Sequence, residues 1–383
     1  MVKKRCLVVS CGLLMACYLA LNTLTFLSQI TRLTGVSEAE GEPGEAREEY
    51  TLPSLEQVIQ SVQDLDVQRV LRMYSEQHSK VPPTPPVRLV VSSTWRSGST
   101  LLAEVLAAHP GVYYHYEPLM SYGLQQLSST HTSKGEILQV LQGLLQCDYS
   151  SAEEYLEFAF TNHEVFVRNT RLWSMCSAMP RSKCYNPDTL ARLCSLFPVH
   201  VMKVVRARLE LLASLLRDPR VRLVWLVRDP RAVMSSRKNS VTWCQTRACS
   251  DAGYLCSDLE EDFNTYLVLK ENFPGRVMLL RYEDLARKPY EKSREILHFA
   301  GLTFHREVQD YLDDHLTSDE DEPWSTRHDP MTRVARWMKV MHFEDVVTTQ
   351  YQCHSVMKNL GYRRFNSRTD MDNGNAVGLL NVP

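Results

Sequence analysis

One short segment of the chain combines small, hydroxyl and cationic residues in a pattern that suits an anion. The run from Val87 to Leu106 reads as a strand, a tight turn and a helix, with R-S-G-S-T at the turn. Backbone N–H groups and the dipole of a helix N-terminus attract negative charge, while hydroxyls and a guanidinium add hydrogen-bond donors. The residues concerned are Arg96, Ser97, Gly98, Ser99 and Thr100. The lysine and spacing of a Walker A loop are absent, so an ordinary turn and helix cap is the alternative for this segment alone.

A second segment places polar residues at the end of another strand. The sequence L-V-R-D-P-R-A-V-M-S-S-R ends an apolar run at Arg228 and then predicts a helix that starts after Asp229. Open α/β sheets bind ligands at the carboxyl ends of their strands. Arg228 and Ser236, about two helical turns later, can therefore reach one phosphate. In the alternative, Arg228 pairs with Asp229 or Glu283 and Ser236 faces solvent.

The elements that must position these residues alternate between short apolar strands and amphipathic helices. This alternation predicts an α/β fold with a P-loop-like core, in which a mainly parallel central sheet is flanked by helices. Strands are predicted at 88–93, 112–116, 199–205, 221–227 and 276–281. Helices are predicted at 101–108, 209–216, 258–271 and 290–300.

Composition narrows the class of protein. The 383 residues are 44% hydrophobic and 23% charged, with a formal net charge of −2, which excludes a mainly disordered or collagen-like chain. The near-neutral charge argues against a nucleic-acid partner. The cysteines lack the paired spacing of a metal site, so no metal is predicted. They are compatible with disulfides in an oxidising compartment. The cysteines that follow the first 27 residues are Cys147, Cys176, Cys184, Cys194, Cys244, Cys249, Cys256 and Cys353.

The N-terminus predicts a membrane anchor. A basic stretch that ends at Arg5 precedes an almost uncharged run from Cys6 to Leu27, which is long enough for a hydrocarbon core of roughly 30 Å. Positive flanking charge stays cytosolic, so the remainder is expected in the lumen, as in a single-pass type II protein. A cleaved signal peptide is the alternative, although no small-residue cleavage site closes the run.

The remaining chain divides into three predicted parts. Residues 28–86 read as a charged, proline-containing stem, residues 87–365 as one globular domain, and residues 366–383 as a flexible polar tail. Residues 1–5 form the cytosolic tail and 6–27 the anchor in this division.

The order of motifs resembles the Golgi carbohydrate sulfotransferases of the galactose, N-acetylgalactosamine and N-acetylglucosamine 6-O group. The resemblance covers the anchor and essentially all of residues 87–362. T-W-R-S-G-S-T looks like their 5′-phosphosulfate loop, and L-V-R-D-P-R-A-V-M-S-S-R looks like their 3′-phosphate element. The other shared segments, in order, are Y-E-P-L at 116–119, D-P-R at 218–220, L-R-Y-E-D-L-A at 280–286, a helix with Trp337, Cys353, and L-G-Y at 360–362.

This resemblance implies a transferase that moves a sulfuryl group from 3′-phosphoadenosine 5′-phosphosulfate to a sugar 6-hydroxyl, on a glycoprotein or proteoglycan glycan. It implies a Golgi membrane location with the catalytic domain in the lumen. The loop residues from Arg96 to Thr100 are expected to hold the phosphosulfate, with Arg96 also stabilising charge on the leaving phosphate. Arg228 and Ser236 are expected to hold the 3′-phosphate. No metal is expected, and a homodimer is left open.

The acceptor hydroxyl needs a base within hydrogen-bond reach, and Glu117 in Y-Y-H-Y-E-P-L is the candidate. Its alternative role is to cap a turn or orient a Lys or Arg. His115 is a weaker rival, since strand alternation turns it away from its neighbours. Lys203 either faces the donor or forms a salt bridge elsewhere. Glu283 and Asp284 are expected to orient Arg281 or a helix start rather than to react.

Two departures from the family pattern bear on the acceptor. One residue is missing between Thr326 and Arg327, and Trp337 is followed by Met338 where an arginine is usual. Acceptor preference is therefore open among the three sugars and their glycan chains, as is the pairing of the cysteines. The alternative functions are transfer to a non-sugar acceptor such as protein tyrosine, and an inactive glycan-binding scaffold.

Overall fold

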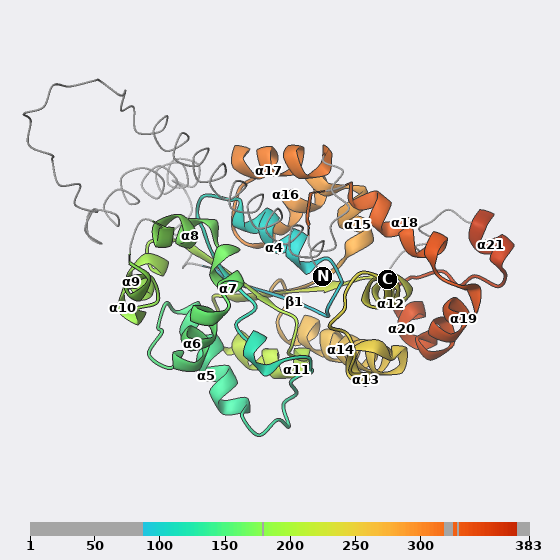
Figure 1. Ribbon diagram of the computed structural model, residues 1–383, viewed down its shortest axis with the longest axis horizontal. Coiled ribbons are helices and arrows are strands. Elements are labelled where there is room, and N and C mark those ends of the chain that lie inside the picture. Colours follow the sequence, from blue (N-terminus) through green and yellow to red (C-terminus); the bar gives the residue numbers. More distant parts are fainter. Residues whose placement is uncertain (1–86, 178–179, 318–324, 328, 374–383) are drawn as a thin grey trace, which may run out of the picture. The chain divides into compact units, whose positions relative to one another are not determined.

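The computed structural model describes residues 87–177, 180–317, 325–327 and 329–373 (Figure 1). The predicted cytosolic tail, anchor and stem lie outside these residues. Among the helices that are described, none has the length and apolar character needed to cross a bilayer. The predicted flexible tail begins with a short helix, α21 (Arg368–Asn373). Ordered structure extends past Phe365 because Met371 is buried in one apolar cluster with Phe365 and Trp337.

Within the described residues, five parallel strands form the central sheet in the order β2-β3-β1-β4-β5. Their bounds are β1 Arg88–Ser93, β2 Val112–Tyr116, β3 Val199–Val204, β4 Val221–Val227 and β5 Val277–Arg281. The predicted parallel sheet is confirmed, with β3 and β5 each one residue shorter than expected. Since β1 lies at the centre, the loop that follows it is flanked by the ends of β3 and β4.

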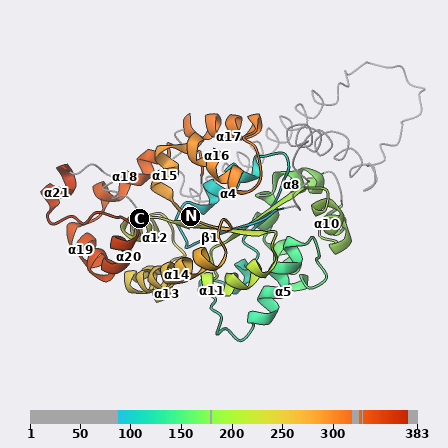
Figure 2. The same cartoon turned by 180° about the vertical axis from the view of Figure 1, so that it is seen from behind.

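Helices cover both faces of the sheet (Figures 1 and 2). Alternation along β1 sends Val90 into one apolar cluster and Leu89 and Val91 into the other. The cluster with Leu89 packs against α4 (Ser99–Ala107), α15 (Tyr282–Arg287), α16 (Pro289–Phe299) and α17 (Arg306–Thr317). The cluster with Val90 packs against α5 (Lys134–Leu145), α6 (Glu153–Thr161), α10 (Pro187–Cys194), α11 (Leu209–Leu212), α14 (Ala252–Asn272) and α20 (His354–Asn359).

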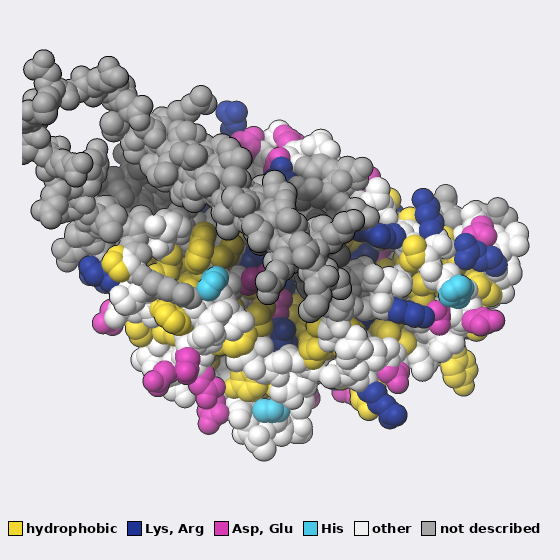
Figure 3. All heavy atoms as spheres, viewed as in Figure 1, with side chains coloured by type: hydrophobic (Ala, Val, Ile, Leu, Met, Phe, Trp, Pro, Cys, Tyr) yellow, Lys and Arg dark blue, Asp and Glu magenta, His cyan; other side chains and the backbone are white. Residues whose placement is uncertain are grey.

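Shorter helices complete the two ends of the sheet. Beside β2 lie η2 (Met120–Tyr122), α7 (Glu164–Val167), α8 (Thr170–Ser177) and α9 (Arg181–Cys184), and η3 (Ala213–Arg217) continues α11. Towards the other end lie α12 (Pro230–Asn239), α13 (Arg247–Ser250), α18 (Pro330–Val340) and α19 (Phe343–Gln352). Basic and acidic side chains are interspersed over the side that carries α18 and α21 (Figure 3).

The predicted helices differ from the observed ones mainly at their ends. Helix α14 starts six residues before the expected position 258, because the Asp251 side chain accepts a hydrogen bond from the Gly253 N–H at 2.7 Å and caps the first turn. Helix α4 starts at Ser99, directly after Gly98 in the left-handed region. The expected helix at 209–216 divides into α11 and the tighter η3.

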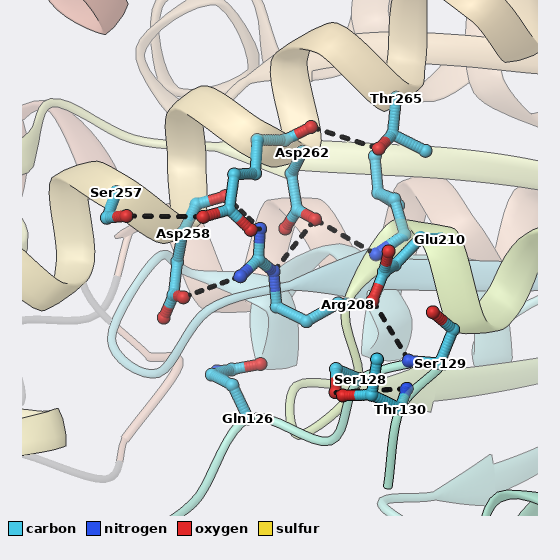
Figure 4. A network of polar contacts seen from close by, with 12 residues as sticks. Gln126, Ser128, Ser129, Thr130, Arg208, Glu210, Ser257, Asp258, Asp262 and Thr265 are labelled. Carbon is cyan, nitrogen blue, oxygen red and sulfur yellow. Dashed lines mark hydrogen bonds and ion pairs between the residues drawn. The ribbon is translucent and has the colours of Figure 1, made fainter.

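A buried ionic network fixes the segment that follows β3 (Figure 4). The Arg208 guanidinium donates to Asp258 Oδ1 at 2.7 Å and to Asp262 Oδ1 at 3.0 Å, and both carboxylates belong to α14. Burial raises the pKa of Asp262 to about 6, against the opposing effect of Arg208. Leu127 pairs in parallel with Ala207, so the chain leaving β3 is held on two sides.

The eight cysteines within the described residues form four disulfides. The pairs are Cys147–Cys194, Cys176–Cys184, Cys244–Cys249 and Cys256–Cys353. The sequence was compatible with disulfides but left their pairing open, and the structure gives that pairing. The longest closed loop, of 97 residues, ties α14 to the start of α20.

We expect the disulfides to stabilise the fold according to the length of chain that they close. Replacing both Cys256 and Cys353 with serine should lower the free energy of unfolding by about 5 kcal/mol, because the closed loop of 97 residues restricts the unfolded chain strongly. The same change at Cys244 and Cys249, which are 5 residues apart, should cost about 2 kcal/mol. Denaturant unfolding measures both, and equal losses would contradict this account.

Candidate active site

A pocket opens at the carboxyl edge of the sheet, where every strand contributes to its wall. The residues at or just after the strand ends are Arg96 from β1, Glu117 from β2, Lys203 from β3, Arg228 from β4 and Tyr282 from β5. Helices α4, α12 and α18 and several connecting segments supply the rest of the wall. The two segments singled out in the sequence therefore meet in one place, as the sheet order requires.

The loop between β1 and α4 has a backbone shaped for close approach. Arg96 has a φ of 71° and Gly98 a φ of 88°, both in the left-handed region. A Cβ at Gly98 would lie 2.3 Å from Cδ2 of Tyr282, so the tyrosine ring covers the glycine directly. Ser99 and Thr100, in the first turn of α4, line the pocket. The N-terminus of α4 is therefore presented to the pocket, as predicted from R-S-G-S-T.

Ser97 differs from its neighbours in this loop. It is fully buried and is not among the residues that line the pocket. Its backbone N–H is bonded to the Thr94 carbonyl at 3.3 Å. The contact with an anion that the sequence predicts for Ser97 therefore stays a prediction.

Arg228 and Ser236 are joined to the loop by hydrogen bonds. Arg96 Nε donates to Ser236 Oγ at 3.0 Å, and Arg228 donates to the Arg96 carbonyl at 3.0 Å. Arg228 also donates to the Arg333 carbonyl at 2.7 Å and lies 4.5 Å from the centre of the Tyr282 ring. All these partners are uncharged, so the guanidinium of Arg228 keeps its charge available to a ligand.

The alternative pairing of Arg228 is wrong. Asp229 forms its ion pair with Arg231 at 2.7 Å. Glu283 accepts the Asp229 N–H at 2.9 Å and the Tyr362 hydroxyl at 3.0 Å. Burial, followed by the repulsion of Asp229, raises the pKa of Glu283 to about 7. Glu283 therefore orients the start of α12, as expected.

Positive charge dominates the pocket. Its cationic side chains are Arg96, Arg168, Lys203, Arg228, Arg333 and Arg336. Glu117 is the only carboxylate among the described residues that line it. Burial, together with the charges of Arg228 and Arg333, lowers the pKa of Arg96 to about 10. The arrangement suits a ligand with several negative charges.

Glu117 lines the same pocket and combines a strained backbone with two cationic partners. Its φ is 41°, unusual for a residue with a side chain. Lys203 Nζ donates to one carboxylate oxygen at 2.6 Å, and Arg206 donates to the other. Burial opposes the charge of Glu117, but Lys203 and Arg206 outweigh it and lower the pKa. The carboxylate is thus ionised, which is the form able to accept a proton.

Lys203 forms the salt bridge that the sequence left open, and it also lines the pocket, where a contact with the donor stays a prediction. Besides its ion pair with Glu117, Nζ donates to Thr100 Oγ1 at 3.0 Å, in the first turn of α4. It also lies 4.2 Å from the centre of the Tyr116 ring. Lys203 therefore connects the anion-facing loop to the carboxylate.

His115 lies away from the pocket. It is buried on the other face of β2, with its ring 5.1 Å from that of Tyr113. Burial and the neighbouring His200 and Arg88 hold the pKa of His115 well below its usual range. Cys194 approaches both histidines in a cluster with metal-like spacing, but its sulfur is bonded to Cys147. It therefore has no thiolate to offer a metal.

Several lining residues were missed by the sequence analysis. Arg333 and Arg336 lie three positions apart on α18, which is the spacing of one helix face and could have revealed them. Tyr282 stands within L-R-Y-E-D-L-A but was given no role. Arg168, between α7 and α8, carries no local signal, because only the fold brings it to the pocket.

The two departures from the family pattern also reach this pocket. Thr326 lines it, and so does Trp337. Met338, in the place of the expected arginine, is buried instead. Arg336, on the other side of Trp337, supplies a cation to the pocket from the same turn of α18.

Comparison with known proteins adds to this geometry. The family described as the sulfotransferase family matches residues 88–306. Carbohydrate sulfotransferase 1 of Danio rerio is 27% identical over 338 residues, which cover 74% of this chain and 80% of the relative. Carbohydrate sulfotransferase 3 of Mus musculus is 27% identical, covering 76% and 71%. Carbohydrate sulfotransferase 5 of Homo sapiens is 28% identical, covering 72% and 78%. The resemblance inferred from the motif order is thereby confirmed.

Solved structures were also found to be similar. The sulfotransferase domain from the curacin biosynthetic pathway has a TM-score of 0.41 and 14% identity, covering 73% of this chain and 99% of that domain. A mouse sulfotransferase, SULT7A1, complexed with PAP has a TM-score of 0.37 and 11% identity, covering 78% and 91%.

The contact between Gly98 and Tyr282 predicts a large effect of adding one methyl group. Gly98→Ala should lower the free energy of unfolding by about 3 kcal/mol or displace the Tyr282 ring, because left-handed strain and overpacking add. Gly275→Ala is the matched control, since its φ is 73° but nothing lies within 4 Å of the added Cβ. Denaturant unfolding compares the two variants. Equal losses would mean that Tyr282 does not constrain the loop.

Proposed function

The chain belongs to the sulfotransferase family, and we propose that it transfers a sulfuryl group from 3′-phosphoadenosine 5′-phosphosulfate to a sugar 6-hydroxyl. The sugar is a galactose, N-acetylgalactosamine or N-acetylglucosamine residue in a glycoprotein or proteoglycan glycan. The observation that carries the proposal is the cationic pocket that joins the β1–α4 loop to the start of α12. Its charge fits a donor with a phosphosulfate and a second phosphate. The named relatives support a sugar acceptor.

In this proposal the two phosphate-bearing ends of the donor occupy the two segments found in the sequence. The 5′-phosphosulfate lies against Arg96, Gly98 and the N-terminus of α4, where Ser99 and Thr100 add hydroxyl donors. The 3′-phosphate lies against Arg228 and Ser236. Arginine side chains and fixed N–H groups neutralise its charge, so the proposal requires no metal.

The reaction is an in-line displacement at sulfur. The acceptor oxygen forms a bond to sulfur while the bond from sulfur to the phosphate oxygen breaks. Glu117 takes the proton of the acceptor hydroxyl, since each carboxylate oxygen keeps one lone pair beyond its bond to Lys203 or Arg206. Arg96 and Lys203 stabilise the charge that develops on the leaving phosphate.

The proposed location is the Golgi membrane, with residues 6–27 as a type II anchor and the catalytic domain in the lumen. The four disulfides within the described residues support an oxidising compartment. Residues 28–86 serve as a stem in this arrangement, which separates the domain from the membrane.

Transfer of labelled sulfate tests the proposed function. The full-length chain is incubated with donor carrying radiolabelled sulfate and with desulfated keratan, chondroitin and N-acetylglucosamine-terminated oligosaccharides, without added metal. We expect label on the 6-hydroxyl of one of the three sugars. Binding of the donor without label on any glycan would exclude a carbohydrate sulfotransferase and favour a non-sugar acceptor or a scaffold.

Glu117→Gln should separate catalysis from donor binding. Because the amide cannot take the proton, we expect kcat to fall by about 100-fold or more, while the Kd for the desulfated donor product stays near the wild-type value. Arg228→Ala is the complementary variant and should raise that Kd. Single-turnover kinetics and calorimetric titration give the two quantities, with thermal unfolding as the check on folding. A nearly unchanged kcat in Glu117→Gln would show that this carboxylate is not the base.

A further inference from the structure

Arg168 stands apart from the other cations of the pocket. Arg96 is close enough to Arg228 and Arg333 for their charges to lower its pKa, so these three arginines form one group. Arg168 comes instead from the segment between α7 and α8 and lies 5.9 Å from the centre of the Tyr116 ring. Tyr116 directly precedes Glu117. Arg168 is therefore on the side of the pocket where the proposed base meets the acceptor.

A single carboxylate holds Arg168 in place. Its NH1 donates to Glu104 Oε1 at 2.6 Å. The other oxygen of Glu104 accepts the hydroxyls of Tyr311 at 2.9 Å and Thr326 at 2.8 Å. Glu104 belongs to α4, the helix whose N-terminus faces the anion. The position of Arg168 is thus fixed relative to the phosphosulfate loop.

Part of the Arg168 guanidinium is left available to a ligand. NH1 makes the sole hydrogen bond of the Arg168 side chain among the described residues, and 26% of this side chain is exposed. Glu104, the balancing carboxylate, does not line the pocket. Arg168 therefore presents unoccupied N–H donors to the pocket while its counter-charge stays behind the wall. An arginine held in this way suits the planar oxygens of a carboxylate or sulfate.

The neighbouring groups add to this preference. Glu117 is shared by two cations, Lys203 and Arg206, so this side of the pocket carries more positive than negative charge. The proposed function assigns the charges of the donor to Arg96 and Arg228, together with the N-terminus of α4 and Ser236. An anionic group on the acceptor would thus meet a net positive charge on this side of the pocket, with Arg168 as a hydrogen-bond donor whose own counter-charge, Glu104, lies behind the wall.

We propose that Arg168 binds a carboxylate or sulfate group on the acceptor glycan, so that the preferred substrate is acidic near the reacting sugar. This inference rests on the proposed function and narrows its acceptor. The acidic group is either the carboxylate of a uronic acid or a sulfate already present on a neighbouring sugar. Both present oxygens in the geometry that a guanidinium recognises.

Two matched pairs of acceptors distinguish these sources. One pair is desulfated chondroitin and the same chain with its carboxyl groups reduced to alcohols. The other is a partly sulfated keratan oligosaccharide and its desulfated form. For the full-length wild-type chain we expect kcat/KM to be about 10- to 100-fold higher for the acidic member of one pair. The pair that shows the difference identifies the group.

Substitution of Arg168 tests whether it causes the preference. Arg168→Gln should bring the ratio of kcat/KM within that pair close to one, and Arg168→Lys should retain part of it because the charge remains. Arg171→Gln is the control: Arg171 is three positions away, pairs with Glu307 at 3.4 Å and lies outside the pocket wall. It should keep the wild-type ratio. Thermal unfolding of each variant shows that the comparison concerns folded protein.

Three outcomes would overturn the inference. Equal kcat/KM for both members of each pair in the wild type would refute the preference for an acidic acceptor but not the proposed sulfate transfer. An unchanged ratio in Arg168→Gln would assign the preference to another residue. Loss of affinity for the desulfated donor product in Arg168→Gln would place Arg168 in the donor site. Absence of transfer to every glycan would instead refute the proposed function, and this inference with it.

Discussion

Repulsion between like charges at the carboxyl edge of the sheet is the constraint to which the surrounding structure responds. Guanidinium groups that pack close together repel one another unless other contacts hold them. Arg228 meets this demand with two backbone carbonyls and the face of Tyr282. Arg237, buried behind the loop, donates to the carbonyls of Trp95 and Cys249. Carbonyls and aromatic rings stabilise a cation without cancelling its charge, and the attraction for an anion is therefore preserved.

The acidic residues near this edge serve mainly to fix the scaffold. Asp229 forms an ion pair with Arg231. Glu283 accepts hydrogen bonds from the backbone N–H of Asp229 and from the hydroxyl of Tyr362. Glu104 and the carboxylates of α14 likewise hold arginines from behind the wall or from the far face of the sheet. Glu117 is the exception, because it reaches the cavity with two cations of its own. Glu117 thus lines the pocket, whereas the other carboxylates fix the scaffold around it.

The sequence was sufficient for the sheet and for the residues that follow its strands. Short apolar runs located all five strands to within a residue. Because ligands bind at the carboxyl ends of parallel strands, Arg96, Glu117 and Arg228 could then be predicted as site residues. Arg168 could not be found in the same way, since no periodicity relates a connecting segment to a strand far away in sequence. Helix ends were also misjudged where a side chain such as Asp251 extends the first turn.

The contacts of β5 and α20 have a consequence for biosynthesis. Arg281 donates to the Leu360 carbonyl, and Tyr362 bonds to Glu283 beneath the start of α12. A nascent chain that has emerged only as far as β5 thus contains every strand but lacks the groups that fix the β4 and β5 ends of the pocket. Cys256 likewise cannot form its disulfide until Cys353 has been synthesised. A product released early by the ribosome would retain an unpaired thiol at Cys256 and an unfinished cavity, so formation of the Cys256–Cys353 disulfide separates chains that reach α20 from shorter ones.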